Sequence, residues 1–149
     1  MEYQELEVLL VEDDPDDLEL TLHTLKEARI TNPMQVARDG EEALDFIFCR
    51  GAHAGSAAPK LRLILLDLKL PKVDGLQVLR EIKSDPRTKN IPVVILTSSK
   101  EEKDLVAGYD LGANSYIQKP VDVSQFQNTI RETGFYWLLV NQPLLPAAR

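Results

Sequence analysis

The chain has 149 residues, of which 44% are hydrophobic and 28% charged, an ordinary composition for one folded domain with its own core. Its net charge of −7 disfavours nucleic-acid binding through a basic surface, so we expect no direct contact with DNA. The single cysteine excludes an intramolecular disulfide, and no apolar stretch approaches the roughly 20 residues that span a bilayer. Because the acidic N-terminus also lacks the architecture of a signal peptide, we expect a cytoplasmic protein.

A short apolar run over residues 6–11 predicts the first strand, and an acidic cluster over residues 12–17 follows it. The cluster has the pattern of a helix start, with Asp14 as N-cap and Pro15 at the first helical position. Apolar side chains then recur at helical spacing, at Leu18, Leu22, Leu25 and Ala28. We expect this helix to end at residues 32–33, because the residue before Pro33 disfavours helical backbone.

The chain continues with a candidate strand over residues 34–37, a turn at residues 39–40 and a helix over residues 41–50. Residues 51–60 are rich in glycine, alanine and serine and predict a loop. The loop is fairly long for a compact domain, and we interpret it as an insertion, not as a linker between domains.

A short apolar run over residues 63–66 comes next and ends abruptly on Asp67. Such a run is typical of a strand that is buried on both faces of a parallel sheet. Asp67 would then lie at the carboxyl end of the strand, the edge where ligands bind in open α/β sheets. Taken alone, an aspartate at that position is equally compatible with a turn or a helix cap.

The second half of the chain repeats the alternation, with a helix over 76–84, a strand over 91–99, a helix over 100–111, a strand over 114–118 and a helix from 121 onward. Five successive strand–helix units predict an α/β fold, with a parallel sheet that is covered by helices on both faces. We expect one domain over residues 1–149, with its core at about 6–133 and an apolar extension at 134–149.

Polar side chains stand at the predicted carboxyl ends of four strands: Glu12 and Asp13, Asp67, Thr97 and Lys119. Parallel strands place all these ends on one edge of the sheet, so the side chains can converge. One polar residue at a strand end is a cap, but three carboxylates with a hydroxyl and an amine on the same edge indicate a site.

The residue types indicate phosphoryl chemistry. Close carboxylates repel one another unless a proton or a cation compensates, and oxygen ligands without His or Cys suit Mg²⁺. An aspartate such as Asp67 can act as the nucleophile and form an acyl phosphate. Thr97 offers a hydroxyl to one phosphoryl oxygen and Lys119 a positive charge to another, so each group has a role in phosphoryl transfer to Asp67.

Five segments in this order closely resemble the receiver domain of two-component response regulators: residues 11–14, 66–71, 74–75, 96–99 and 116–120. The resemblance implies a flavodoxin-like (βα)5 fold, doubly wound, with a five-stranded parallel sheet in the order 2-1-3-4-5. It also implies a switch that is not an enzyme on other substrates: a histidine kinase donates a phosphoryl group to Asp67, and the chain signals through protein contacts.

The resemblance also implies roles for individual residues. Asp13 would bind Mg²⁺ directly and Glu12 through water, while Asp67 and the backbone carbonyl of Lys69 would complete the protein ligands. Thr97 and Lys119 would sense the phosphoryl group. We also expect the Lys69 side chain to hinder an attacking water and so to prolong the phosphorylated state.

Tyr116 would be the aromatic switch that moves inward when Thr97 shifts, although an aromatic residue in a last strand is also compatible with plain packing. The tail has six consecutive apolar residues over 135–140, which cannot all face one core at a helical period. They form either an end cap on their own domain or an interface, and we expect a homodimer. The expected interface residues are Phe135, Tyr136, Trp137, Leu138 and Leu139.

The chain resembles the single-domain response regulators of bacterial, especially cyanobacterial, phytochromes in three features: the loop at 51–60, the aromatic tail and the expected absence of an output domain. A phytochrome-type light sensor is therefore the expected histidine kinase. The alternative is an adaptor with a receiver fold that is never phosphorylated. A haloacid-type phosphohydrolase would need an acid where Lys69 stands, and a flavodoxin-like cofactor binder would need a phosphate loop in place of the acidic cluster at 12–17.

Overall fold

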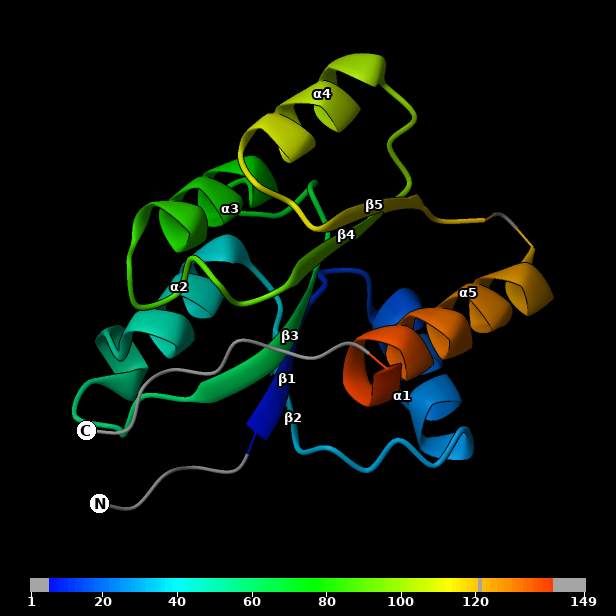
Figure 1. Cartoon of the computed structure of the whole chain (residues 1–149), viewed down its shortest axis with the longest axis horizontal. Helices are drawn as coiled ribbons and strands as arrows, with labels where there is room; N and C mark the ends of the chain where they lie inside the picture. The colour runs from blue at the N-terminus through cyan, green and yellow to red at the C-terminus, as the bar shows by residue number, and fades with distance from the viewer. Residues whose placement is uncertain (1–5, 121, 141–149) are drawn as a thin grey trace.

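The computed structural model describes residues 6–120 and 122–140, which form one parallel sheet with helices on both faces (Figure 1). The strands are β1 (Leu6–Val11), β2 (Met34–Ala37), β3 (Lys60–Leu66), β4 (Val93–Thr97) and β5 (Ser115–Gln118). The helices between and after them are α1 (Pro15–Glu27), α2 (Gly40–Phe48), α3 (Gly75–Ser84), α4 (Glu102–Asp110) and α5 (Val123–Phe135). The strand order β2-β1-β3-β4-β5, with every pair parallel, confirms the predicted fold.

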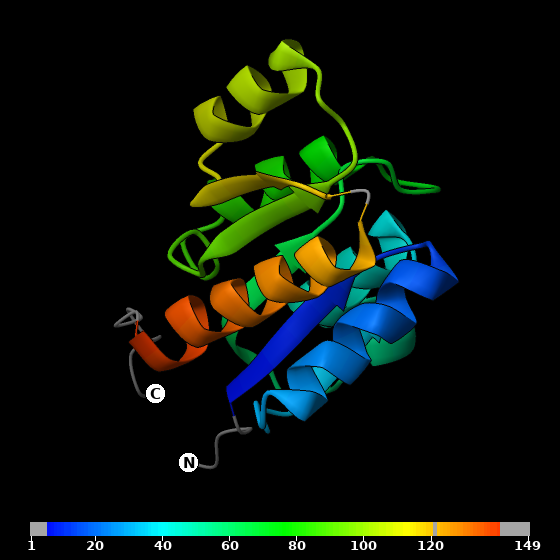
Figure 2. The same cartoon turned by 90° about the vertical axis from the view of Figure 1, so that its right-hand side faces the viewer.

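Two apolar clusters, one on each face of the sheet, form the core. Because side chains alternate along a strand, Leu9 and Val11 of β1 enter one cluster while Val8 and Leu10 enter the other. The first cluster packs against α2 and α3, and the second packs against α1 and α5. Figure 2 shows α1 and α5 side by side on one face of the sheet, with α4 at the far end beyond β5.

Helix α1 begins as predicted, because the Asp14 carboxylate accepts hydrogen bonds from the backbone of Asp16 and Asp17. It ends at Glu27, earlier than the predicted boundary at residues 32–33. The backbone turns into the left-handed region at Arg29, with φ of 60°, and this turn carries Ile30 back into the core, where it is 6% exposed. The helix therefore ends in a turn that closes on its own last carbonyls, before the chain reaches the residues next to Pro33.

Other predicted boundaries shift by one to three residues: α2 ends at Phe48 instead of residue 50, β4 spans Val93–Thr97 instead of 91–99, α4 spans Glu102–Asp110 instead of 100–111, and α5 begins at Val123 instead of 121. Strand β3 begins at Lys60, three residues before the apolar run, because pairing with β1 extends to the register Leu6 with Lys60. The predicted loop at 51–60 contains a short 3₁₀ turn over Gly51–His53 before it leads into β3. None of the helices among the described residues has the length and apolar character to cross a membrane.

The described part of the tail folds partly onto its own domain. After α5 the chain makes a π-helical turn over Tyr136–Val140. Leu138 is 1% exposed within the same cluster as α1 and α5, and Trp137 packs against that cluster. The core therefore reaches past the predicted boundary at residue 133. Phe135 and Tyr136 are 41% and 50% exposed, while the side chain of Leu139 and residues 141–149 lie outside the described part of the chain.

Candidate functional site

The carboxyl edge of the sheet brings together the polar residues that follow its strands. The backbone amide of Asp67 donates to the carbonyl of Val11 at 3.1 Å, which places the end of β3 beside the end of β1. The amide of Lys119 likewise donates to the carbonyl of Thr97 at 2.7 Å, which joins the ends of β5 and β4. The predicted convergence of the four strand ends is therefore present.

Three carboxylates form the acidic part of the site. Oxygen atoms of Glu12, Asp13 and Asp67 lie within 4.8 Å of one another. Glu12 and Asp67 are 4% and 7% exposed, whereas Asp13 is open to solvent. Hard oxygen donors that are buried on one side and open to water on the other fit a divalent cation that keeps part of its hydration shell, as Mg²⁺ does.

Lys119 lies at the centre of this cluster and is 9% exposed. Its ammonium donates to Glu12, to Asp17 Oδ2 at 2.9 Å and to Asp67 Oδ2 at 3.1 Å. Asp17 was expected only as an acidic residue of a helix first turn. Side chains of a helix lean toward its N-terminus, so a residue in the first turn of α1 points back toward the end of β1. This place in the sequence was the feature from which a role of Asp17 in the site could have been predicted.

Burial sets the protonation of the cluster. It raises the pKa of Glu12 to about 7, although the hydrogen bond and charge of Lys119 act in the opposite direction. Burial alone would lower the pKa of Lys119, but its hydrogen bonds to Glu12 and Asp17 and the charge of Asp67 reverse this effect and raise the pKa above its ordinary value. The ammonium therefore stays charged, and Glu12 carries a proton in part of the molecules at neutral pH.

The loop after β3 holds the second oxygen of Asp67. The backbone amide of Lys69 donates to Asp67 Oδ1 at 3.3 Å. Helix α3 begins very close to this loop, because a Cβ at Gly75 would lie 2.3 Å from the carbonyl oxygen of Asp67 and 2.6 Å from the Cα of Leu68. Glycine in the predicted Asp74-Gly75 motif is therefore required by this close approach of the backbone.

Thr97 ends β4, the strand that pairs with the acceptor strand β3, and Tyr116 lies on β5, the next strand in the sheet. Thr97 is fully buried, and its Oγ1 accepts a bond from the amide of Ser99 at 3.4 Å. The hydroxyl of Tyr116 donates to the carbonyl of Ser99 at 3.2 Å, so the half-buried ring points toward the loop between β4 and α4. Burial raises the pKa of this hydroxyl. Ser99, which was expected only as a polar residue at the end of a strand, thus connects the two.

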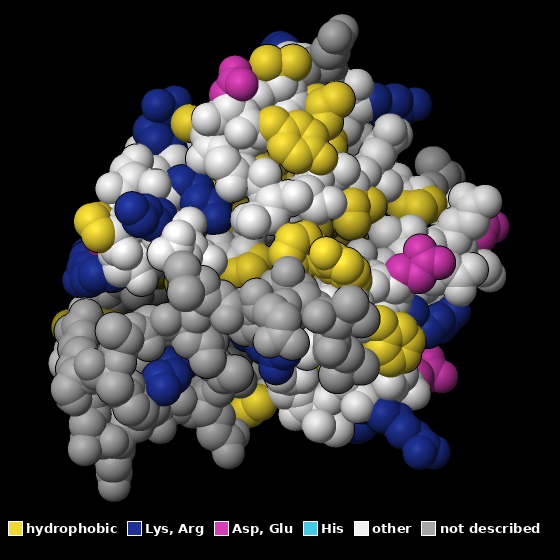
Figure 3. All heavy atoms as spheres, in the orientation of Figure 1, with side chains coloured by type: hydrophobic (Ala, Val, Ile, Leu, Met, Phe, Trp, Pro, Cys, Tyr) yellow, Lys and Arg dark blue, Asp and Glu magenta, His cyan; other side chains and the backbone are white. Residues whose placement is uncertain are grey.

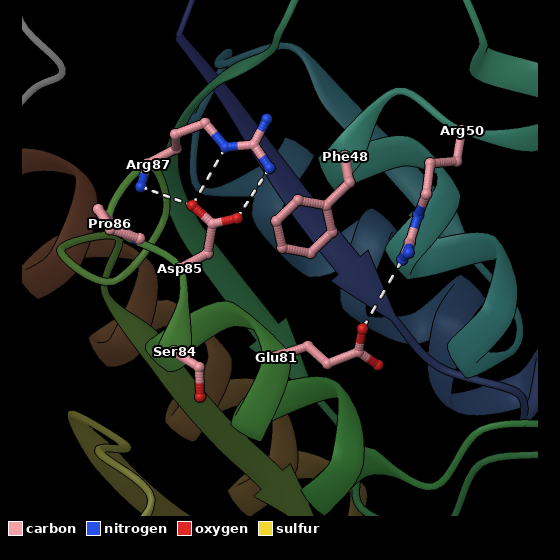
Figure 4. A pocket seen from close by; sticks show the side chains of 7 residues that line it. All are labelled: Phe48, Arg50, Glu81, Ser84, Asp85, Pro86 and Arg87. Carbon is pink, nitrogen blue, oxygen red and sulfur yellow. Dashed lines mark hydrogen bonds and ion pairs between the residues drawn. The ribbon is translucent and has the colours of Figure 1, made fainter.

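A separate hollow of about 390 Å³ lies near the opposite edge of the sheet, where α2 and α3 end (Figure 4). The ring of Phe48 lies between the guanidinium groups of Arg50 and Arg87, at 5.2 and 5.5 Å from its centre. Each arginine already faces a carboxylate, Glu81 for Arg50 and Asp85 for Arg87. The hollow therefore has no part in the acidic site.

Comparisons with known proteins point to one family. The family model of the response regulator receiver domain matches residues 8–131. Response regulator Rcp1 of Synechocystis sp. is 40% identical over 141 residues, which cover 95% of this chain and 93% of that protein. The crystal structure of the phosphorylated cyanobacterial phytochrome response regulator RcpA superposes with a TM-score of 0.87 at 39% identity, over 97% of this chain and 100% of that chain.

The structure of the Mn²⁺-bound form of Rcp1 has the same TM-score of 0.87, again at 39% identity, and covers 95% of this chain and 99% of that chain. A relative that matches nearly the whole of this chain therefore binds a divalent ion. Together with the three adjacent carboxylates of this chain, the similarity indicates a divalent metal site at the carboxyl edge of the sheet.

Proposed function

Because this chain belongs to the response regulator receiver family, a family of signalling switches, we propose that Asp67 accepts a phosphoryl group from a histidine kinase. The observation that carries the proposal is that an ammonium and two further carboxylates converge on Asp67, with the buried Thr97 at the end of the neighbouring strand β4. The same arrangement would not be needed by an adaptor that is never phosphorylated.

In the proposed reaction an Asp67 oxygen attacks phosphorus, and the bond from phosphorus to the kinase histidine nitrogen breaks with its electron pair on that nitrogen. Asp13 and Asp67, with Glu12 through water and the Lys69 carbonyl, would hold Mg²⁺. When bound, that ion supplies positive charge that reduces repulsion between the phosphoryl oxygens and the carboxylates. Lys119 then exchanges its bond with Asp67 for one with a phosphoryl oxygen.

The phosphoryl group is proposed to change the two adjacent strands. Thr97 reorients its hydroxyl toward a phosphoryl oxygen and gives up its bond with the amide of Ser99. Movement of the loop that contains Ser99 then breaks the bond from Tyr116, whose ring can turn inward. Phosphorylation at one edge is in this way transmitted to the surface of α4 and β5.

Intact-mass spectrometry after incubation with acetyl phosphate and Mg²⁺ tests the proposal. We expect the wild type to gain one phosphoryl group, and Asp67→Asn to gain none. EDTA should prevent the gain in the wild type. If neither acetyl phosphate nor a series of histidine kinases modifies the wild type, the adaptor alternative is favoured instead.

A phytochrome-type kinase is the proposed donor, and it would place the reaction in the cytoplasm. The support is the extent of the similarity to Rcp1 and to RcpA, which spans nearly the whole of each protein. Phosphoryl transfer from a phytochrome histidine kinase should be fast and should change between red and far-red light. A matched kinase without a photoreceptor should transfer the group more slowly; equal rates would contradict the pairing.

We also propose a homodimer through the exposed tail side chains, Phe135 and Tyr136. Removing the tail would be a poor test, because it deletes the buried Leu138. Sedimentation of Phe135→Ser/Tyr136→Ser should instead show a monomer. The control is Val123→Ser at the start of α5, a 59% exposed hydrophobic residue outside the tail. Hydrophobic side chains also gather over α4 and β5 (Figure 3), the surface to which phosphorylation is proposed to be transmitted. A monomeric wild type, or a dimer that persists in the double variant, would contradict this interface.

A further inference from the structure

Asp104, in the first turn of α4, is a buried acidic residue that the proposed phosphoryl transfer does not use. It is only 6% exposed. A carboxylate at that depth requires partners that offset its lost hydration. Both partners reach the same oxygen: the hydroxyl of Ser99 donates to Asp104 Oδ2 at 2.6 Å, and the ammonium of Lys69 lies 3.6 Å from it.

These two partners come from the two loops that border the acceptor. Lys69 follows Asp67 by two residues and donates its backbone amide to that carboxylate. Ser99 follows Thr97 by two residues and is joined to it by its own amide. One carboxylate on α4 therefore connects the loop after β3 to the loop after β4, beside the residues that are proposed to accept and sense the phosphoryl group.

We propose that Asp104 is a positioning residue that competes with the phosphoryl group for the ammonium of Lys69. In the structure Lys69 is paired with Asp104, and its side chain is 63% exposed and free to move through solvent. A phosphoryl group on Asp67 would carry a charge of about −1.5 to −2, which exceeds that of the carboxylate. This inference rests on the proposed phosphorylation of Asp67.

The competition controls how long the phosphoryl group persists. In hydrolysis a water oxygen forms a bond to phosphorus, the bond from phosphorus to Asp67 breaks, and its electron pair returns to the carboxylate as phosphate and a proton leave. An ammonium on the phosphoryl oxygens obstructs the approach of that water. Asp104 holds the ammonium of Lys69 away for part of the time, so Asp104 shortens the phosphorylated lifetime.

The test measures self-dephosphorylation in Mg²⁺ after loading the full chain with acetyl phosphate. Asp104→Asn removes the charge but keeps an oxygen that can accept from Ser99. It should slow hydrolysis by about two- to fivefold, the range by which one partly exposed ion pair shifts an equilibrium. Asp110→Asn, which changes an exposed carboxylate on the same helix, should leave the rate unchanged.

A double-mutant cycle makes the test specific to Lys69. In a Lys69→Met background, Asp104→Asn should have no effect on the rate, because no ammonium remains for the two anions to share. A wild-type rate in Asp104→Asn, or a slowing that persists in the Lys69→Met background, overturns the proposal. A merely structural role of Asp104 would produce the second of these results.

A measurement without phosphorylation separates this inference from the proposed function. The two substitutions should shift the urea midpoint of the unphosphorylated protein by less together than the sum of their separate shifts. If the wild type accepts no phosphoryl group, the proposed function fails, and this coupling still decides whether Asp104 holds Lys69. Additive shifts would overturn the pairing itself.

Discussion

Replacing Lys119 by methionine tests whether this ammonium is the internal cation of the acidic cluster. The change keeps most of the side-chain volume and removes three hydrogen bonds to carboxylates. Removing one partner of a buried ion pair costs about 3–5 kcal/mol. Here Glu12 can take up a proton: the hydrogen bond and charge of Lys119 hold its pKa down to about 7 in the wild type, so this pKa rises further when Lys119 is removed. We therefore expect a loss of about 2–3 kcal/mol at pH 8 in EDTA.

Urea unfolding with EDTA and with Mg²⁺ measures this loss and its origin. A divalent ion can replace the missing positive charge, so Mg²⁺ should stabilise Lys119→Met more than it stabilises the wild type. The pKa of Glu12 is about 7 in the folded wild type and higher without Lys119, so the ionisation of Glu12 differs between the two proteins at pH 8 but much less at pH 6, and the loss should shrink as the pH falls. Lys100→Met, at an exposed position, is the control. Equal stability of Lys119→Met and the wild type in EDTA would refute the reasoning.

Three further predictions concern the core, the acceptor loop and the metal. Leu138→Ala should lower the free energy of unfolding by about 2–4 kcal/mol, whereas Glu132→Ala in α5 should change it by less than about 0.5 kcal/mol, because only Leu138 is buried. Similar losses in urea unfolding would contradict the packing of the tail. Gly75→Ala should cost at least about 2 kcal/mol, since its Cβ would lie 2.3 Å from a backbone oxygen, and calorimetry against Ser56→Ala, at an exposed loop position, checks this. The affinity for Mg²⁺ should fall as the pH drops from 8 to 6, because protonation of Glu12 near pH 7 removes a negative charge from the site. Calorimetric titration measures this affinity, and a value that does not change with pH would show that Glu12 does not contribute.

The sequence was sufficient for the fold and for the residues at the strand ends. Apolar runs that are typical of strands alternate with segments in which apolar residues recur at helical spacing. Parallel strands then place their carboxyl ends on one edge of the sheet. Asp67 and Lys119 could therefore be assigned to one edge, although 52 residues separate them and the structure is what shows their 3.1 Å contact.

The residues that the sequence did not reveal are those whose roles depend on tertiary direction. Asp17 has the ordinary pattern of a helix first turn, and only the packing of α1 against β1 turns it toward Lys119. Asp104 lies on a helix with few apolar residues, where a buried charge has no periodic signal. Leu138 was part of a uniformly apolar run, so periodicity could not separate the side that packs inward from the exposed Tyr136.

Chemical trapping of the phosphorylated residue tests the central claim most directly. After reaction with acetyl phosphate and Mg²⁺, borohydride reduces an aspartyl phosphate to homoserine, and tandem mass spectrometry of the peptides locates it. We predict homoserine at position 67 and nowhere else in the chain. Homoserine at Asp13 or another carboxylate, or none in a protein whose intact mass has increased, would contradict the account.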